Sequence, residues 1–147
     1  VLLQKCKPGK NVLVAGGGSV GVETAEYLAL YGHNVTVVEM LYDILNGCER
    51  ETMLLLRKAI KEYDIDVYTS SKVINIDGDK VTLSRKGKEI VLDEIDTVVI
   101  AAGSKPYNPL QPILEGAGIP VRVVGDSMEV TNGLKGIYAG YMAGYEI

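Results

Sequence analysis

The stretch from Asn11 to Glu39, NVLVAGGGSVGVETAEYLALYGHNVTVVE, decides the fold of this chain. It opens with a short valine-rich run, Asn11 to Ala15, which is typical of a strand buried on both faces. Apolar residues at helical spacing follow from Ser19 to Tyr31, and Gly32 then supplies a residue that can end a helix in the left-handed conformation. A second valine-rich run, Val35 to Glu39, completes the unit. About 30 residues in the order strand, helix, strand predict a βαβ unit with parallel strands.

The turn between this first strand and helix carries a GxGxxG motif. A pyrophosphate is bound by backbone N–H groups at the positive end of a helix, and side chains at the first two glycines would obstruct it. The motif alone is a weak signal, but here it follows a buried strand and opens a helix. We therefore expect the whole turn to bind a dinucleotide: Gly16, Gly17, Gly18, Ser19, Val20 and Gly21. The alternative is a tight turn without a ligand.

Glu39 stands at the end of the second strand, 18 residues after Gly21. A carboxylate at this place accepts hydrogen bonds from the hydroxyls of an adenosine ribose and repels a 2′-phosphate. We therefore predict NAD(H) rather than NADP(H) as the ligand, with Glu39 and the adjacent Met40 as contact residues. The alternative for Glu39 is a solvated acid in a loop.

Glu23 is placed by the periodicity in the first turn of the predicted helix. A carboxylate there either stabilises the positive end of the helix or faces the nicotinamide of a bound cofactor. The residues alone leave both interpretations open.

Further along the chain, the pattern predicts one more helix and five more strands up to Gly103. Asp77-Gly78-Asp79 and Arg85-Lys86-Gly87-Lys88 are hairpin signals, which predict a small antiparallel β-meander. The unbroken apolar run TVVIAA, from Thr97 to Ala102, favours a central strand over an edge strand. The fold class is therefore α/β, a three-layer arrangement of a Rossmann-like parallel sheet and a small meander. The expected elements are a helix at Glu49–Tyr63 and strands at Ile65–Tyr68, Val73–Ile76, Val81–Ser84, Glu89–Leu92 and Thr97–Ala102.

The proline-rich segment from Ser104 to Pro120 indicates a domain boundary after Gly103. We expect a first domain over residues 1–103. Residues 104–147 would hold a connecting segment and part of a second domain. In that second part the sequence predicts one helical turn near Ile113 to Gly116, a strand at Val121 to Val124 and a helix from Leu134 to Ile147.

Composition bounds the function. The 147 residues carry a net charge of −4, which offers no basic surface for nucleic acid. No apolar run is long enough to cross a bilayer, and we expect a cytoplasmic protein. Cys6 and Cys48 form no dithiol motif and His33, the single histidine, falls in a turn, so no metal site is expected. Because the chain begins with Val1, we expect it to be a piece of a longer polypeptide.

Three segments resemble the C-terminal part of the NADH:flavin oxidoreductase family, which includes 2-enoate reductases and 2,4-dienoyl-CoA reductases. They are GKNVLVAGGGSVGVETAEYLALYGHNVTVVEM, DTVVIAAGSKPYNPL and VRVVGDSMEVTNGLKGIYAGYMAGYEI. More broadly, the chain is similar to the pyridine nucleotide-disulfide oxidoreductase fold, in which an NAD(P)H-binding domain is inserted into an FAD-binding domain.

The resemblance implies residue roles. The glycine turn would bind NADH, Glu23 would lie near the nicotinamide, and Ala102 and Gly103 would lie close to the dinucleotide. Asp126 would match the aspartate that hydrogen-bonds the flavin ribityl chain. Residues 1–103 would then be the NAD(H)-binding domain, and residues 104–147 the connection and the C-terminal remnant of an FAD-binding domain. The glycine motif that opens the family's FAD-binding domain has no counterpart in this sequence, and the FMN-binding barrel and iron–sulfur cysteines would lie upstream.

The implied function is delivery of hydride from NADH to FAD, for reduction of an enoate or enoyl-CoA type substrate elsewhere in the full-length protein. The partners would be the nicotinamide dinucleotide and the flavin domain of the same polypeptide, and the isolated chain would be inactive. Two alternatives remain: a non-catalytic module for NADH sensing or interaction, and an S-adenosylmethionine-dependent methyltransferase.

Overall fold

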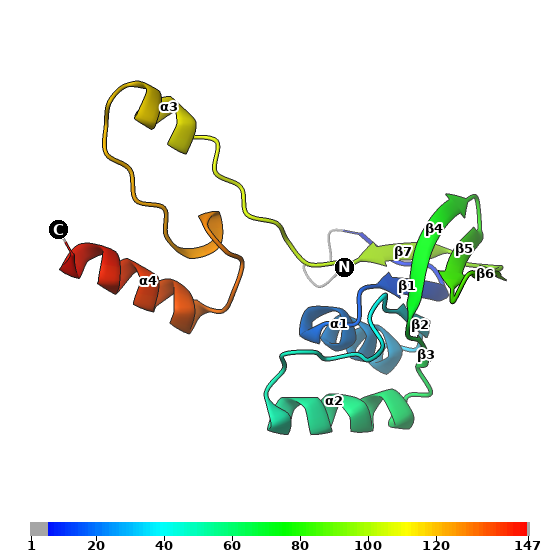
Figure 1. The fold of residues 1–147 in the computed structure, drawn as a ribbon. Coiled ribbons are helices and arrows are strands. Elements are labelled where there is room, and N and C mark those ends of the chain that lie inside the picture. Colours follow the sequence, from blue (N-terminus) through cyan, green and yellow to red (C-terminus); the bar gives the residue numbers. More distant parts are fainter. Residues whose placement is uncertain (1–5, 147) are drawn as a thin grey trace. The chain divides into compact units, whose positions relative to one another are not determined.

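The computed structural model describes residues 6–146, in two units that meet in the sequence between Gly103 and Ser104 (Figure 1). The first unit is built on a four-stranded parallel sheet in the order β3-β2-β1-β7. Its strands are, in that order, Asp66–Tyr68, Asn34–Val38, Asn11–Ala15 and Thr97–Ile100. The predicted βαβ unit is present, with β1 and β2 in register from Asn11 opposite Asn34 to Ala15 opposite Val38.

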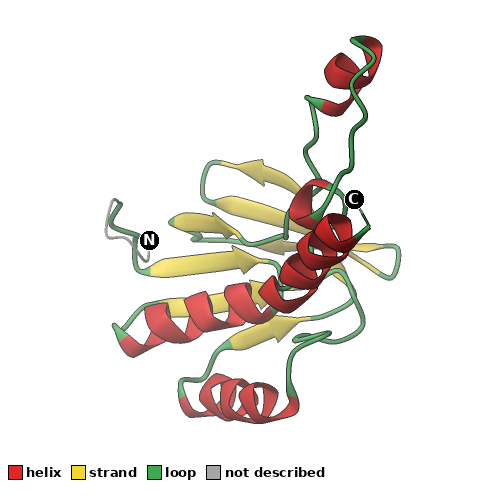
Figure 2. Ribbon diagram, turned by 90° about the vertical axis from the view of Figure 1, so that its left-hand side faces the viewer, coloured by secondary structure: helices red, strands yellow, loops and turns green. Residues whose placement is uncertain are grey.

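Two helices cover one face of this sheet, α1 (Ser19–Leu30) and α2 (Arg50–Glu62), and Figures 1 and 2 show them on the same side of the strands. Successive side chains along a strand point to opposite faces of the sheet. Val12 and Val14 of β1 accordingly pack with Ala25 and Leu28 of α1. Gly32, with φ +85, follows the end of α1 and confirms the predicted left-handed stop.

The other face is covered by an antiparallel meander of β4 (Ser71–Asp77), β5 (Lys80–Arg85) and β6 (Lys88–Leu92). Leu13 of β1 and Val38 of β2 point to this face, where they pack with Val81 and Leu83 of β5. Helices, parallel sheet and meander are therefore three layers, and the predicted α/β fold class is confirmed.

The position of β7 corrects a prediction. Among the described strands it pairs with β1 alone, and it lies at the edge of the sheet, not in its centre. Its apolar character has another cause: Val98 packs on the meander side and Val99 on the helix side. An apolar run indicates that both faces of a strand are covered, but it does not indicate whether the strand has a hydrogen-bonded neighbour on each side.

The second unit consists of α3 (Gln111–Gly116), a 3-10 turn η1 (Gly125–Ser127) and α4 (Gly133–Tyr145). The strand predicted at Val121 to Val124 is wrong. The backbone of Val124 is extended, with φ −140 and ψ 161, but the described part of this unit contains no other strand to pair with it.

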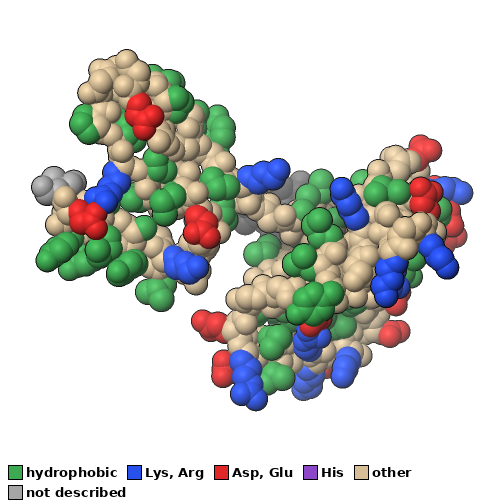
Figure 3. Space-filling view, in the orientation of Figure 1, with side chains coloured by type: hydrophobic (Ala, Val, Ile, Leu, Met, Phe, Trp, Pro, Cys, Tyr) green, Lys and Arg blue, Asp and Glu red, His purple; other side chains and the backbone are tan. Residues whose placement is uncertain are grey.

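No residue described in the second unit is buried. Figure 3 shows hydrophobic side chains spread over its visible surface. The helix α4 begins where Asn132 caps it, since the Asn132 side chain accepts a hydrogen bond from the Lys135 N–H at 3.0 Å. Its local signals are therefore those of an ordinary helix, but none of its described residues is buried.

Candidate functional site

A hollow of about 500 Å³ opens in the first unit where β1, β2 and β7 end. Ligands of open parallel α/β sheets bind outside the carboxyl ends of the strands, at such a place. The structure brings most of the predicted contact residues to its lining. These are Gly16, Gly18, Ser19, Val20, Gly21, Glu39, Met40, Ala102 and Gly103.

Two glycines of the turn are required by the protein's own packing. Gly16 has φ +123, and a Cβ on it would collide with the Ala101 carbonyl of the neighbouring strand end. A Cβ on Gly21 would collide with the Gly16 carbonyl and thus separate the helix from the turn. These close approaches bring the start of α1 down onto the ends of β1 and β7.

Gly18 is different. Its φ of −67 and ψ of 177 suit any residue, and a Cβ placed on it would meet no protein atom within 4 Å. Gly18 is the N-cap of α1, a position that serine or asparagine fills at least as well as glycine, so the fold does not require a glycine here. Because Gly18 lines the hollow, its missing side chain leaves the backbone open to whatever the hollow binds.

Gly17 faces the opposite way and does not line the hollow. A Cβ there would stand 2.6 Å from Ile44 Cγ2 and 2.9 Å from Glu39 Cβ, so both side chains lie close against its backbone. The Gly17 N–H donates to Glu39 Oε2 at 2.7 Å. Packing against the loop after β2 accounts for this glycine.

Glu39 directly follows β2 and is only 8% exposed. Its Oε2 accepts from the Gly17 N–H and its Oε1 accepts from the Leu41 N–H, both at 2.7 Å. Each carboxylate oxygen has two lone pairs, so Glu39 keeps acceptor capacity for hydroxyls in the hollow that it lines. The two backbone donors hold the carboxylate in one orientation.

Glu23 and Asp126 are not brought into this hollow. The first turn of α1 contains no acidic residue, because the helix begins at Ser19, and the first-turn placement of Glu23 is therefore wrong. Glu23 is exposed and lines a separate hollow with residues of α2, among them Thr52 and Glu62. Asp126 lies in η1 of the second unit, where its Oδ1 accepts from the Thr131 N–H at 3.3 Å.

Sequence reasoning missed several lining residues, among them Leu41, Asn46 and Ser71. Ser71 is buried at the start of β4, and its N–H donates to the Glu39 carbonyl at 2.9 Å. The rule that sites form where parallel strands end could have located it, since Ser71 follows β3 closely. Asn46 lies in the irregular loop between β2 and α2, where no periodicity gives a signal.

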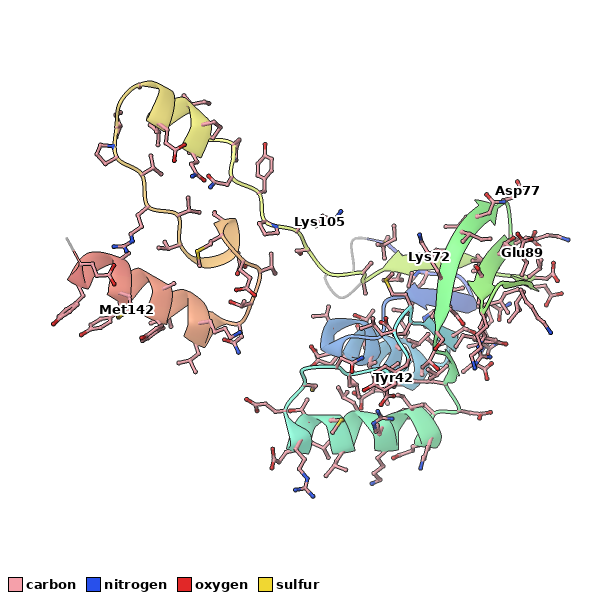
Figure 4. The ribbon with its side chains drawn as sticks, viewed as in Figure 1. Tyr42, Lys72, Asp77, Glu89, Lys105 and Met142 are labelled. Carbon is pink, nitrogen blue, oxygen red and sulfur yellow. The ribbon has the colours of Figure 1, made fainter. Side chains whose placement is uncertain are left out.

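An ion pair fastens that loop to α2. Arg57 Nη2 lies 2.7 Å from Asp43 Oδ2, and the Ile44 N–H donates to Asp43 Oδ1 at 2.9 Å. The Arg57 hydrogen bond, followed by that of Ile44, lowers the pKa of Asp43 below its usual 3.8. Figure 4 marks Tyr42 on the same loop.

Other candidate ligands lie elsewhere. The ring Nδ1–H of His33 donates to the Gly9 carbonyl at 2.7 Å, which ties the turn after α1 to the chain before β1. Among residues 6–146 there is no group of three His, Cys, Asp or Glu side chains that could hold a metal ion. The helices in the same range are all too short or too polar to span a bilayer.

A parallel α/β sheet, a glycine turn at the start of α1 and a carboxylate at the end of β2 together define a Rossmann-type nucleotide-binding domain. The chain belongs to the pyridine nucleotide-disulphide oxidoreductase family, whose model matches residues 1–140. This family assignment contradicts the methyltransferase alternative.

Curated relatives include an NADH oxidase of Thermoanaerobacter brockii, 35% identical over 140 residues, which are 94% of this chain and 21% of the relative. A bilirubin reductase of Mediterraneibacter gnavus is 34% identical over 137 residues, 92% of this chain and 21% of the relative. A solved structure of a 2-naphthoyl-CoA reductase superposes with a TM-score of 0.80 at 30% identity, covering 99% of this chain and 22% of that one. The chain thus spans about a fifth of the length of these relatives.

Proposed function

We propose that the first unit binds NADH in the hollow at the strand ends, with the pyrophosphate over the glycine turn. The observation that carries the proposal is Gly18, a glycine that the fold does not require and that opens the backbone toward the hollow. A pyrophosphate needs close access to backbone N–H groups at the start of a helix, and α1 begins at the next residue, Ser19.

Glu39 supports the choice of NADH. Its carboxylate is held by two backbone N–H groups at the wall of the hollow, where it would accept the hydroxyl protons of the adenosine ribose. The 2′-phosphate of NADPH would meet this fixed negative charge and be repelled. Met40 and Leu41 line the same wall with apolar surface.

Ala102 and Gly103 form the opposite wall, beyond the end of β7. In this proposal they border the nicotinamide half of the ligand, while the glycine turn and Glu39 hold the adenosine half. Glu23 lines a separate hollow with residues of α2, and its place near the nicotinamide stays a prediction.

The chain in this proposal is the NADH-binding part of a flavin-dependent enzyme of the NADH:flavin oxidoreductase type. NADH would supply hydride to FAD, and the longer protein would reduce an enoate or enoyl-CoA type substrate. A relative named cinnamate reductase, from Clostridium sporogenes, supports this substrate class at 32% identity over 145 residues, as does the 2-naphthoyl-CoA reductase.

Asp126 is the proposed flavin contact of the second unit. That unit has no buried residue among those described, so we expect it to complete an FAD-binding domain whose other part lies outside this chain. The isolated chain would then bind NADH and show no reductase turnover.

Calorimetric titration of the purified chain with NADH, NADPH, FAD and S-adenosylmethionine tests the proposal. We expect a one-to-one complex with NADH and weaker binding of NADPH. Binding of S-adenosylmethionine or FAD, with none of NADH at millimolar concentration, would contradict it.

A further inference from the structure

The loop between β2 and α2 contains a buried residue in a strained conformation. Leu45 is 2% exposed and has φ +60, a region that leucine rarely adopts because Cβ crowds the backbone. Such a conformation persists only where the surroundings fix it. The Leu45 side chain belongs to a buried cluster with Val22 of α1 and Leu56 of α2. Packing between the two helices therefore holds the strained backbone in place.

The amide of Leu45 reaches the glycine turn. It donates to the Gly17 carbonyl at 2.7 Å, while the Gly17 N–H donates to Glu39 Oε2 at 2.7 Å. Both backbone polar groups of Gly17 are thus held by the chain that follows β2. The close approach of Ile44 to the Gly17 backbone adds a steric contact on the same side.

These bonds fix the orientation of the peptide between Gly17 and Gly18. In a planar trans peptide the carbonyl and the following N–H point in opposite directions. Because the Gly17 carbonyl points to Leu45, the Gly18 N–H points away from the loop, on the side of the peptide opposite Leu45. Gly18 itself lines the hollow.

A peptide between two glycines rotates more easily than any other, since neither residue has a Cβ. If this peptide flipped, it would present a carbonyl oxygen in place of an N–H donor to an anion in the hollow. We propose that Leu45 is a positioning residue, whose amide locks the Gly17–Gly18 peptide with the Gly18 N–H available to the pyrophosphate. This inference rests on the proposed NADH site.

The first test compares Leu45→Ala with Leu56→Ala by calorimetric titration with NADH. Both substitutions remove a buried leucine side chain from the same cluster. Of the two residues, only Leu45 donates a backbone hydrogen bond to the glycine turn. We expect Leu45→Ala to raise the Kd for NADH about ten-fold and Leu56→Ala less than about two-fold. Equal effects of the two substitutions would overturn the proposal.

A second variant, Leu45→Gly, separates backbone geometry from packing. Glycine takes φ +60 without strain, so its amide can stay on the Gly17 carbonyl although the side chain is gone. We expect its Kd for NADH to lie closer to that of the parent than the Kd of Leu45→Ala. If affinity instead falls in the order leucine, alanine, glycine, packing alone decides and the proposal is wrong.

Hydrogen exchange of the Leu45 amide in the parent chain needs no variant. We expect this amide to be protected without NADH and more strongly protected with it. Exchange at the rate of an open loop amide would contradict the lock. If the parent does not bind NADH, the proposed function fails; if it binds NADH and Leu45→Ala binds as tightly as the parent, only the lock fails.

Discussion

Gly17 and Gly18, adjacent in the turn, face opposite sides of it. Gly17 packs on Ile44 and Glu39, while Gly18 opens on the hollow. The sequence motif treats them alike, but the physical reasons for the two glycines differ. Substitution of each by alanine therefore separates a requirement of the fold from a requirement of the ligand.

Gly17→Ala should lower the free energy of unfolding by about 1–3 kcal/mol, because its Cβ overpacks the loop after β2. Gly18→Ala should change that free energy by less than about 1 kcal/mol, since alanine fits φ −67 and restricts the unfolded chain but is a poorer N-cap than glycine. It should nevertheless weaken NADH binding at least about ten-fold. Chemical denaturation measures the free energy of unfolding, and titration calorimetry measures NADH binding. Unimpaired NADH binding by Gly18→Ala would contradict the placement of the pyrophosphate over the glycine turn.

Glu39→Gln preserves the shape of the side chain but removes its charge and one of its two carboxylate acceptors. The variant should bind NADH more weakly, and its preference for NADH over NADPH should shrink because the 2′-phosphate no longer meets a negative charge. The ratio of the two Kd values is the measurement. Glu89→Gln, an exposed site on β6, is the matched control and should leave this ratio unchanged.

Asp43 gives a prediction for pH. Its pKa is lowered in the folded state, so the Arg57 pair stabilises the fold above pH 3.8, and this stabilisation is lost as pH falls through the lowered pKa. Asp43→Asn should therefore be less stable than the parent at pH 7, by a small amount because the pair is partly exposed. Denaturation curves at several pH values should show the difference vanish at acid pH. A difference independent of pH would speak against the ion pair as its cause.

At the scale of elements, local signals predicted β1, α1 and β2 to within a residue. Their boundaries are set by glycines and by valine-rich runs, which act within a few residues. The edge position of β7 and the missing strand at Val121 to Val124 depend on partners far along the chain or outside it. The same limit applies to the site: the glycines and Glu39 follow from spacing, but Leu45 and Asn46 lie in a loop without periodicity.

The turn between β5 and β6 offers a test of local backbone strain. Lys86 and Gly87 have φ values of +50 and +77, a pattern that favours Asn-Gly in a two-residue hairpin. Lys86→Asn should raise the free energy of unfolding by up to about 1 kcal/mol, because asparagine tolerates the left-handed region better than lysine. Gly87→Ala should lower it by about 1 kcal/mol. Thermal unfolding measures both; a destabilised Lys86→Asn together with a stabilised Gly87→Ala would refute the turn geometry.

At the scale of the molecule, the two units differ in whether they have a buried core of their own. All buried hydrophobic residues of the described chain lie between Val12 and Leu83, and the hollow is lined by residues up to Gly103. The second unit contributes no buried residue among those described. The chain spans about a fifth of its relatives' length, and we propose that the exposed apolar side chains of α4 pack on other parts of a longer protein.

A chain ending at Gly103 should consequently fold by itself. We expect it to unfold cooperatively and to bind NADH with a Kd within about two-fold of that of the 147-residue chain. Circular dichroism and calorimetry provide the measurements. Loss of cooperative unfolding on truncation would mean that residues after Gly103 contribute to the core.

The central claim is that NADH binds in the hollow at the ends of β1, β2 and β7. Amide chemical shifts of the labelled chain, followed during titration with NADH, test it most directly. We expect the largest changes on residues 16, 18–21, 39–41 and 101–103, which line the hollow. No change there, or changes confined to the α1–α2 hollow around Glu23 or to the second unit, would contradict it.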